Sequence, residues 1–204
     1  ISVTIVAAHE DGKADYSSEV ATLASAGGDA VAVIGYIDQG GKGIIQGSLD
    51  SGAFDTFILS DGMIGDALTD TFGKSLNKSF GSLPGSTGKG AGVFATVAGD
   101  AGIDPSGPYT GESYDAAALI VLAMQASGSA DRKGIADNVM AVANAPGKKI
   151  YPGQLKKALD LLAKGKAVDY EGATGVMFTE VGEAEGSFLE KEVKGGKFKT
   201  KKQR

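Results

Sequence analysis

The fold class is decided by two similar segments, Ala30-Val-Ala-Val-Ile-Gly-Tyr36 and Thr56-Phe-Ile-Leu-Ser-Asp-Gly62. Each is a short apolar run that closes on turn-forming residues, which is typical of a strand. Between them Ile44, Ile45 and Leu49 share one face of a predicted helix. Strand, helix and strand recurring at about 26 residues predict a parallel α/β sheet. The strands lack strict alternation, which indicates that helices cover both faces of the sheet.

The same pattern continues on both sides of these two segments. Towards the start, the β-branched run 1–8 predicts a first strand and residues 15–26 predict a helix that stops at a glycine pair. Beyond the second segment, residues 64–72 predict a third helix and residues 79–83 a further strand. Right-handed crossovers then determine how neighbouring strands are connected.

The second half of the sequence is richer in helix. We predict helices at residues 114–126, after the N-cap Asp131, and within residues 153–165. Residues 178–188 predict a turn and a strand, and residues 191–204 hold seven Lys or Arg and are expected to be a solvated terminus. This half has few strands, so we expect its helices to pack on a sheet that these residues do not fully contain.

The composition excludes several functional classes. With no Cys among 204 residues, the chain has no thiol nucleophile, disulfide or thiolate metal site. A single His cannot supply a centre of several imidazoles, and we expect neither a metal nor a cofactor. The net charge of −5 argues against binding to nucleic acid. The longest apolar stretch, residues 116–124, is about half of the ~20 residues that a bilayer crossing needs.

Three polar groups follow the predicted strands at the edge where parallel sheets bind ligands, namely His9, Tyr36 and Asp61. The Asp61 carboxylate can accept hydrogen bonds from a cation, and Tyr36 offers a ring face and a hydroxyl. Simpler interpretations remain open at this point: Asp61 caps the following helix, Tyr36 is a buried anchor of its loop, and His9 is a solvated loop histidine.

The glycine-rich run 85–90 does not have the spacing of a phosphate-binding loop. That motif requires Gly at the position of Leu83 and Ser or Thr at the position of Gly90. A glycine-rich dinucleotide loop is also absent, because the first predicted strand is followed by Ala8-His-Glu-Asp11.

The order of three motifs carries a family resemblance. They are Pro105-Ser-Gly-Pro-Tyr-Thr-Gly-Glu-Ser-Tyr-Asp-Ala-Ala-Ala-Leu-Ile-Val-Leu-Ala123, Pro146-Gly-Lys-Lys-Ile-Tyr-Pro-Gly-Gln154 and Asp169-Tyr-Glu-Gly-Ala-Thr-Gly-Val-Met-Phe-Thr-Glu-Val-Gly-Glu183. This set resembles the carboxyl-terminal half of periplasmic solute-binding proteins of ABC importers, of the branched-chain amino-acid-binding (Leu/Ile/Val) type. Two earlier segments, residues 15–23 and 57–62, agree with the second lobe of that family.

The resemblance implies a type I periplasmic binding protein fold, with two α/β lobes that close on a small ligand. It implies that residues 1–84 belong to lobe two and residues 85–181 to a second portion of lobe one. Residues 182–204 would cross back towards lobe two and end in the basic tail. The first part of lobe one, and any signal peptide, would lie outside these residues.

The resemblance also assigns roles to three side chains. Tyr36 matches an aromatic residue of lobe two that contacts the bound amino acid. Asp61 matches the acidic position that takes the ligand's α-ammonium, where family members often have Glu. Tyr109 matches an aromatic residue that packs on the ligand side chain. The family's Ser/Thr pair for the ligand carboxylate falls outside these residues.

The expected function is therefore binding without catalysis. A small amino acid or related carboxylate would bridge the lobes, and the membrane permease of an ABC importer would read the closed form. The location implied is periplasmic or extracytoplasmic. Two alternatives stay open, namely a ligand-sensing domain of a receptor and a doubly wound α/β enzyme that uses His9 or Asp61 in acid–base chemistry.

Overall fold

A computed structural model describes all residues from Ile1 to Arg204, which form two compact units. Unit 1 consists of two separate segments, Ile1–Leu83 and Leu189–Arg204, and unit 2 is the continuous segment Pro84–Phe188. The chain therefore passes between the units twice, after Leu83 and after Phe188.

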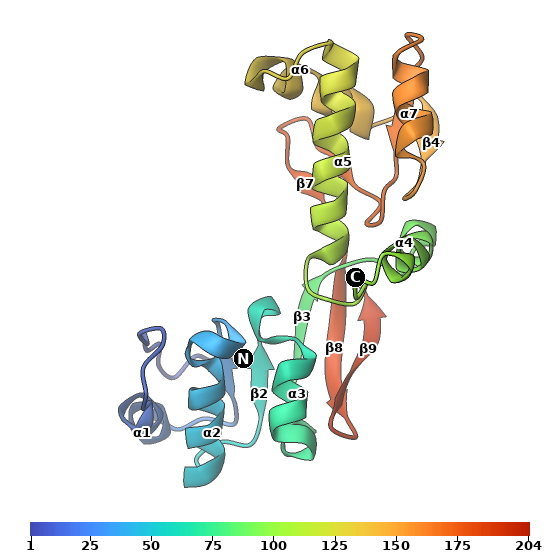
Figure 1. Ribbon diagram of the computed structural model, residues 1–204. Helices are drawn as coiled ribbons and strands as arrows, with labels where there is room; N and C mark the ends of the chain where they lie inside the picture. The colour runs from blue at the N-terminus through green and yellow to red at the C-terminus, as the bar shows by residue number, and fades with distance from the viewer. The chain divides into compact units, whose positions relative to one another are not determined.

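Unit 1 is built around one sheet with helices on its connections (Figure 1). Its helices are α1 (Ser17–Ala26), α2 (Lys42–Ser51) and α3 (Asp66–Phe72). Its strands are β1 (Val31–Val33), β2 (Phe57–Leu59), β3 (Phe80–Pro84), β8 (Phe188–Lys194) and β9 (Lys197–Gln203). The sequence predicted these three helices and strands β1 to β3, with bounds that differ by a few residues.

The sheet of unit 1 has the order β1-β2-β3-β8-β9. Strands β1, β2 and β3 are parallel, with Val31 opposite Phe57 and Ile58 opposite Phe80. Strands β8 and β9 form an antiparallel hairpin, in which Val193 lies opposite Phe198. Because β1 and β2 run in the same direction, the residues that follow them emerge at the same edge of the sheet.

The core of unit 1 lies between this sheet and its helices. Phe57 from β2, Ile45 from α2 and Leu68 from α3 are fully buried there, and Val193 of β8 is 2% exposed. Each such side chain contributes about 1.5–3 kcal/mol by leaving water. The returning segment is thus part of the same core as the first 83 residues.

The prediction of a first strand at residues 1–8 is wrong. These residues have no strand assignment, and Ile1, Val3 and Val6 are exposed. Strand β1 at the edge of the sheet begins only at Val31. A β-branched run favours extended backbone, but it becomes a strand only where a neighbouring strand accepts its hydrogen bonds.

The basic end of the chain is also not a solvated terminus. Residues 197–203 form strand β9, which pairs with β8 along its length except for a register shift between Glu190 and Lys191. Asn77 fastens the hairpin turn, because its side-chain oxygen accepts a hydrogen bond from the Gly196 backbone amide at 3.0 Å. Lysines at the edge of a sheet are compatible with a strand because their side chains remain in water.

Unit 2 is mainly helical (Figure 1). Its helices are α4 (Lys89–Asp100), α5 (Thr110–Ser127), α6 (Arg132–Ala143) and α7 (Leu155–Leu162). Its short strands are β4 (Lys148–Ile150), β5 (Val168–Tyr170), β6 (Met177–Phe178) and β7 (Ala184–Glu185), of which β4 and β5 pair in parallel. Asp131 caps α6 as predicted, since its carboxylate accepts a hydrogen bond from the Gly134 amide.

Helix α4 was not predicted, since residues 84–92 carry turn signals. It contains Gly90, Gly92 and Gly99, which lower the helix propensity of the segment. Gly90 is required by packing: a Cβ added there would lie 2.1 Å from the backbone oxygen of Gly172. Gly90 thus lowers the helix propensity of this segment, and it also permits the close contact between α4 and the loop after β5.

Candidate functional site

Tyr36 and Asp61 are brought together in unit 1 by the ends of β1 and β2. Ser60 links the two loops, because its hydroxyl lies 3.3 Å from both the amide nitrogen and the carbonyl oxygen of Gly35. The Ser60 amide also donates to the Val33 carbonyl at 3.2 Å. The sequence predicted this convergence from the parallel topology, and the two loops do meet.

The ring of Tyr36 lies over the backbone of Gly62. A Cβ added to Gly62 would be 2.9 Å from Cδ1 of Tyr36 and 2.5 Å from the carbonyl oxygen of Gly35. Tyr36 itself is 63% exposed, so it is not a buried loop anchor. An aromatic face held open to solvent next to a carboxylate can contact a small amine through both its ring and its neighbour.

Asp61 begins a tight helical turn, Asp61–Met63, and one of its carboxylate oxygens accepts a hydrogen bond from the Gly62 amide at 2.8 Å. Helix α3 starts later, at Asp66, with Gly65 as its N-cap. Asp61 is therefore not the N-cap of that helix, and its carboxylate is held by its own turn beside Tyr36.

The loop after Tyr36 is a kinked turn, Ile37–Gly41, that leads directly into α2. Gly40 has a φ of 121°, a conformation that side-chain-bearing residues rarely adopt. A Cβ on Gly41 would lie 2.2 Å from the sulfur of Met63, which follows Asp61 by two residues. Glycine at both positions thus lets the turn after Tyr36 close onto the turn that carries Asp61.

The amino-terminal loop packs against the turn that follows Tyr36. The His9 imidazole is against two glycines of that turn, 3.3 Å from the positions of an added Cβ on Gly35 and on Gly40. Its side chain is 17% exposed, so it is not a solvated loop histidine. The ring of Tyr16 meets that of His9 edge-on, with centroids 6.0 Å apart.

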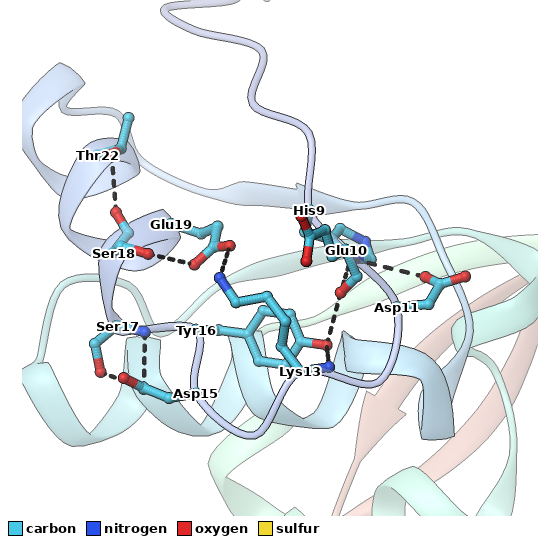
Figure 2. A network of polar contacts seen from close by, with 10 residues as sticks. All are labelled: His9, Glu10, Asp11, Lys13, Asp15, Tyr16, Ser17, Ser18, Glu19 and Thr22. Carbon is cyan, nitrogen blue, oxygen red and sulfur yellow. Dashed lines mark hydrogen bonds and ion pairs between the residues drawn. The ribbon is translucent and has the colours of Figure 1, made fainter.

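Figure 2 shows Tyr16 at the centre of this loop. Its hydroxyl donates a hydrogen bond to the Glu10 carbonyl at 2.9 Å and accepts one from the Lys13 amide at 3.0 Å. Its ring is 5% exposed and occupies the space that a Cβ on Gly43 would need. Tyr16 thereby joins the amino-terminal loop to the start of α2.

An ion pair between Lys13 and Glu19 closes the loop onto α1, with 2.5 Å between Nζ and Oε1 (Figure 2). The hydrogen bond from Lys13, and a second one from the Ser18 hydroxyl, lower the pKa of the Glu19 carboxyl to about 2. The same contact raises the pKa of Lys13. Both groups therefore stay charged at neutral pH.

Tyr109, the third predicted residue, belongs to unit 2. It precedes α5 and has a φ of 60°, which makes it the one non-glycine residue with positive φ. Its side chain is 40% exposed. A bulky residue in this conformation costs about 1–3 kcal/mol, and such costs gather at functional sites.

A buried carboxylate in unit 2 was missed by sequence reasoning. Asp115 on α5 is 2% exposed and accepts hydrogen bonds from the Tyr170 hydroxyl, the Ala173 amide, and both the amide and hydroxyl of Thr174, at 2.7–2.9 Å. Burial, and then the neighbouring Asp115 carboxylate, raise the pKa of the Tyr170 hydroxyl, which keeps it a donor. The sequence offered one signal for this site, which is the position of Asp115 inside a helix, where a charged residue is rarely buried.

Other kinds of site are not formed. No group of three or more His, Asp or Glu side chains is placed to hold a metal ion. None of the helices has the length and apolar character of a membrane span. A polar hollow of about 250 Å³ adjoins Phe80, Glu192 and Lys201. It lies at the start of β3, the opposite edge of the parallel strands from Tyr36 and Asp61.

The fold defined by these elements is that of the type I periplasmic binding proteins. Solved structures with this fold match 93–95% of the chain at 12–20% sequence identity. The chain spans about half the length of those proteins, at 49–50% of each. No protein-family model matches the sequence.

The individual neighbours include amino-acid-binding proteins. A leucine-binding protein, LivK, from Thermotoga maritima matches with a TM-score of 0.66 at 20% identity, over 94% of this chain and 49% of that one. The branched-chain amino-acid transporter substrate-binding protein LivJ from Streptococcus pneumoniae, solved with isoleucine, matches with a TM-score of 0.65 at 18% identity, over 95% and 49%. The chain thus resembles the branched-chain type named from its motifs, and these neighbours are binding proteins, not enzymes.

One curated protein is similar in sequence over a shorter stretch. It is the chemotactic signal transduction system substrate-binding protein BasB of Halobacterium salinarum, 39% identical over 71 residues. That stretch covers 35% of this chain and 17% of BasB.

Proposed function

We propose that this chain is part of an extracytoplasmic solute-binding protein that binds a small amino acid or related carboxylate for an ABC importer. The observation that carries the proposal is the joint placement of Tyr36 and Asp61 at the carboxyl edge of a sheet of this fold class. The similarity to LivK and LivJ, whose descriptions name leucine and isoleucine, supports the ligand class.

In this proposal Asp61 binds the ligand's α-ammonium and Tyr36 covers it. The Asp61 carboxylate is anchored by the Gly62 amide at 2.8 Å, which fixes its orientation before ligand arrives. Tyr36 offers an exposed ring beside it, and a cation over such a ring gains about 0.5–2 kcal/mol. Rigid placement of both groups lowers the entropy that binding must remove.

Tyr109 is proposed as the contact for the ligand side chain. Its positive φ is a cost that the fold bears at this one non-glycine residue, which supports a role other than packing. We further propose that unit 1 corresponds to lobe two and unit 2 to a portion of lobe one. Helix α5 supports this, because Ile120 and Val121 are 46% and 39% exposed and would be covered by further structure of that lobe.

The test is a thermal-unfolding screen of the intact protein against the natural amino acids and their keto-acid analogues. A ligand present at 100 times its Kd stabilises a protein by about 2.7 kcal/mol, which is readily seen as a rise in Tm. We expect such a rise with one or a few small amino acids. A complete screen with no shift would refute the proposal.

A sensing role is the second candidate, and the similarity to BasB favours it, because that protein is described as part of a chemotactic signal transduction system. Both roles share the same ligand site. They differ in the membrane partner, so cross-linking of the ligand-loaded protein in native membranes separates a permease from a transducer. An acid–base enzyme has less support, since the His9 imidazole packs against glycines and Tyr16, and the carboxylate nearest to it, that of exposed Asp11, is 3.9 Å away.

A further inference from the structure

We propose that strand β9 is a docking edge for an acidic, extended polypeptide segment, which adds to the sheet of unit 1 as a further strand. Strand β9 is the last strand of the order β1-β2-β3-β8-β9, so the outer edge of residues 197–202 pairs with no other strand of residues 1–204. Figure 1 shows it beside β8 at this margin of unit 1. This inference rests on no part of the proposed ligand site.

The charge of the hairpin is opposite to that of the chain. Residues 189–204 contain seven Lys or Arg and two Glu, whereas the whole chain has a net charge of −5. Three of these cations are held in ion pairs: Lys197 with Asp70 of α3, and Lys201 and Arg204 with Glu190. Some cations of the hairpin thus form ion pairs within unit 1, and others form none.

The remaining cations lie along the strand without carboxylate partners. Lys199 and Lys202 are exposed and form no ion pair. Glu192 is opposite Lys199 in the strand register but does not reach ion-pair distance from it. Unpaired lysines beside an open strand edge supply both charge and backbone hydrogen bonds to an incoming segment.

The charge pattern selects among possible occupants. A second copy of β9 would place lysines opposite lysines, which disfavours pairing of two copies through this edge. Nucleic acid is disfavoured by the net negative charge of the chain. An anionic lipid surface would engage the lysines but not the open backbone groups. Only an acidic strand uses both features.

The test uses the full chain and two synthetic seven-residue peptides of alternating Glu and Val, one with ordinary amides and one with alternate amides N-methylated. We expect the ordinary peptide to bind in low salt, to protect β9 amides from hydrogen exchange, and to dissociate as salt rises. We expect the N-methylated peptide, with the same charge, to bind at least tenfold more weakly. Equal binding of the two peptides would overturn strand addition.

Two charge-matched variants locate the binding surface. The double variant Lys199→Gln/Lys202→Gln should weaken binding of the ordinary peptide at least tenfold. The control Lys164→Gln/Lys166→Gln removes two exposed, unpaired lysines from unit 2 and should leave the affinity within twofold. Equal losses in both variants, or Lys199-dependent binding to phosphatidylglycerol vesicles with no binding to the peptide, would overturn the proposal.

Discussion

At the scale of single residues, the candidate site depends on glycines as much as on the side chains of Tyr36 and Asp61. Gly62 and Gly41 leave room for Tyr36 and Met63, so that two loops from different strands meet. The sequence predicted Tyr36 and Asp61 because polar groups after parallel strands converge. It also placed His9 at this edge, although through a strand at residues 1–8 that does not form. It did not predict that His9 and Tyr16 pack against Gly35, Gly40 and Gly43, because these contacts depend on tertiary packing.

The substitution Gly62→Ala tests this packing. Its Cβ would come within 2.5 Å of the Gly35 carbonyl, so the backbone or the Tyr36 ring must move. We expect a destabilisation of about 1–3 kcal/mol in urea unfolding, with weaker ligand binding. The control Gly92→Ala adds a Cβ in open space inside α4 and should stabilise the protein by about 0.5–1 kcal/mol. The same sign of change for both variants would contradict this account.

The substitution Asp61→Asn tests the role of the carboxylate. It keeps the size of the side chain and an oxygen that can accept from Gly62, but it removes the negative charge. We expect affinity for an α-amino ligand to fall more than tenfold, measured by calorimetry on the intact protein, with little change in Tm without ligand. Unchanged affinity would reduce Asp61 to a residue that shapes its own turn.

At the scale of elements, the sequence predicted helices and strands best where a neighbour is close in the chain. Strands β1 to β3 and helices α1 to α3 follow one another and were predicted. Residues 1–8 and strand β9 were assigned wrongly, because strand formation depends on a partner strand, and lysine-rich sequence resembles solvated chain. Helix α4 was hidden by glycines that serve its contact with the loop after β5.

The attachment of the amino-terminal loop to α1 predicts a pH dependence. The pKa of Glu19 is lowered from 4.5 to about 2 in the folded protein, so its ion pair with Lys13 stabilises the fold fully above pH 4.5. This contribution is lost as the pH falls from about 4.5 towards 2, where the folded state also takes up the proton.

The measurement is the difference in urea midpoint between the wild type and Glu19→Gln. We expect it to be largest at neutral pH and to vanish near pH 2. Asp29→Asn is the matched control, since Asp29 is exposed and forms no ion pair. A difference that persists unchanged at pH 2 would show that the substitution acts through something other than the charge of Glu19.

At the scale of the whole molecule, each unit has a core of its own. The buried cluster of unit 1 includes Phe57 and Leu68, and that of unit 2 includes Leu122 and Tyr170. Separate cores predict that the units unfold with separable stabilities. The sequence indicated the change of character after Leu83, but it did not reveal that Val193 returns to the first core, since such contacts are distant along the chain.

The substitution Asp115→Ala tests whether stability is divided in this way. It leaves the buried Tyr170 hydroxyl and Ala173 amide, and the partly buried Thr174 amide, without their acceptor, at a cost of about 3 kcal/mol or more. We expect faster hydrogen exchange in β4 and β5 and an unchanged exchange rate in β1 to β3. The control Asp137→Ala removes only a surface ion pair and should change stability by less than about 0.5 kcal/mol. Equal loss of protection in both units would mean that they unfold as one block.

The split composition of unit 1 has a consequence for its synthesis. Unit 2 is continuous, so it has all its residues once Phe188 has left the ribosome. Unit 1 begins first but needs strands β8 and β9 from the last residues, Leu189–Arg204, to complete its sheet. At a synthesis rate of about 5–20 residues per second, residues 1–83 remain for seconds without the two strands that complete their core. Of the two units, the one whose residues come earlier in the sequence is therefore the one that completes its sheet later, and the edge of β3 that pairs with β8 is open to a chaperone during that interval.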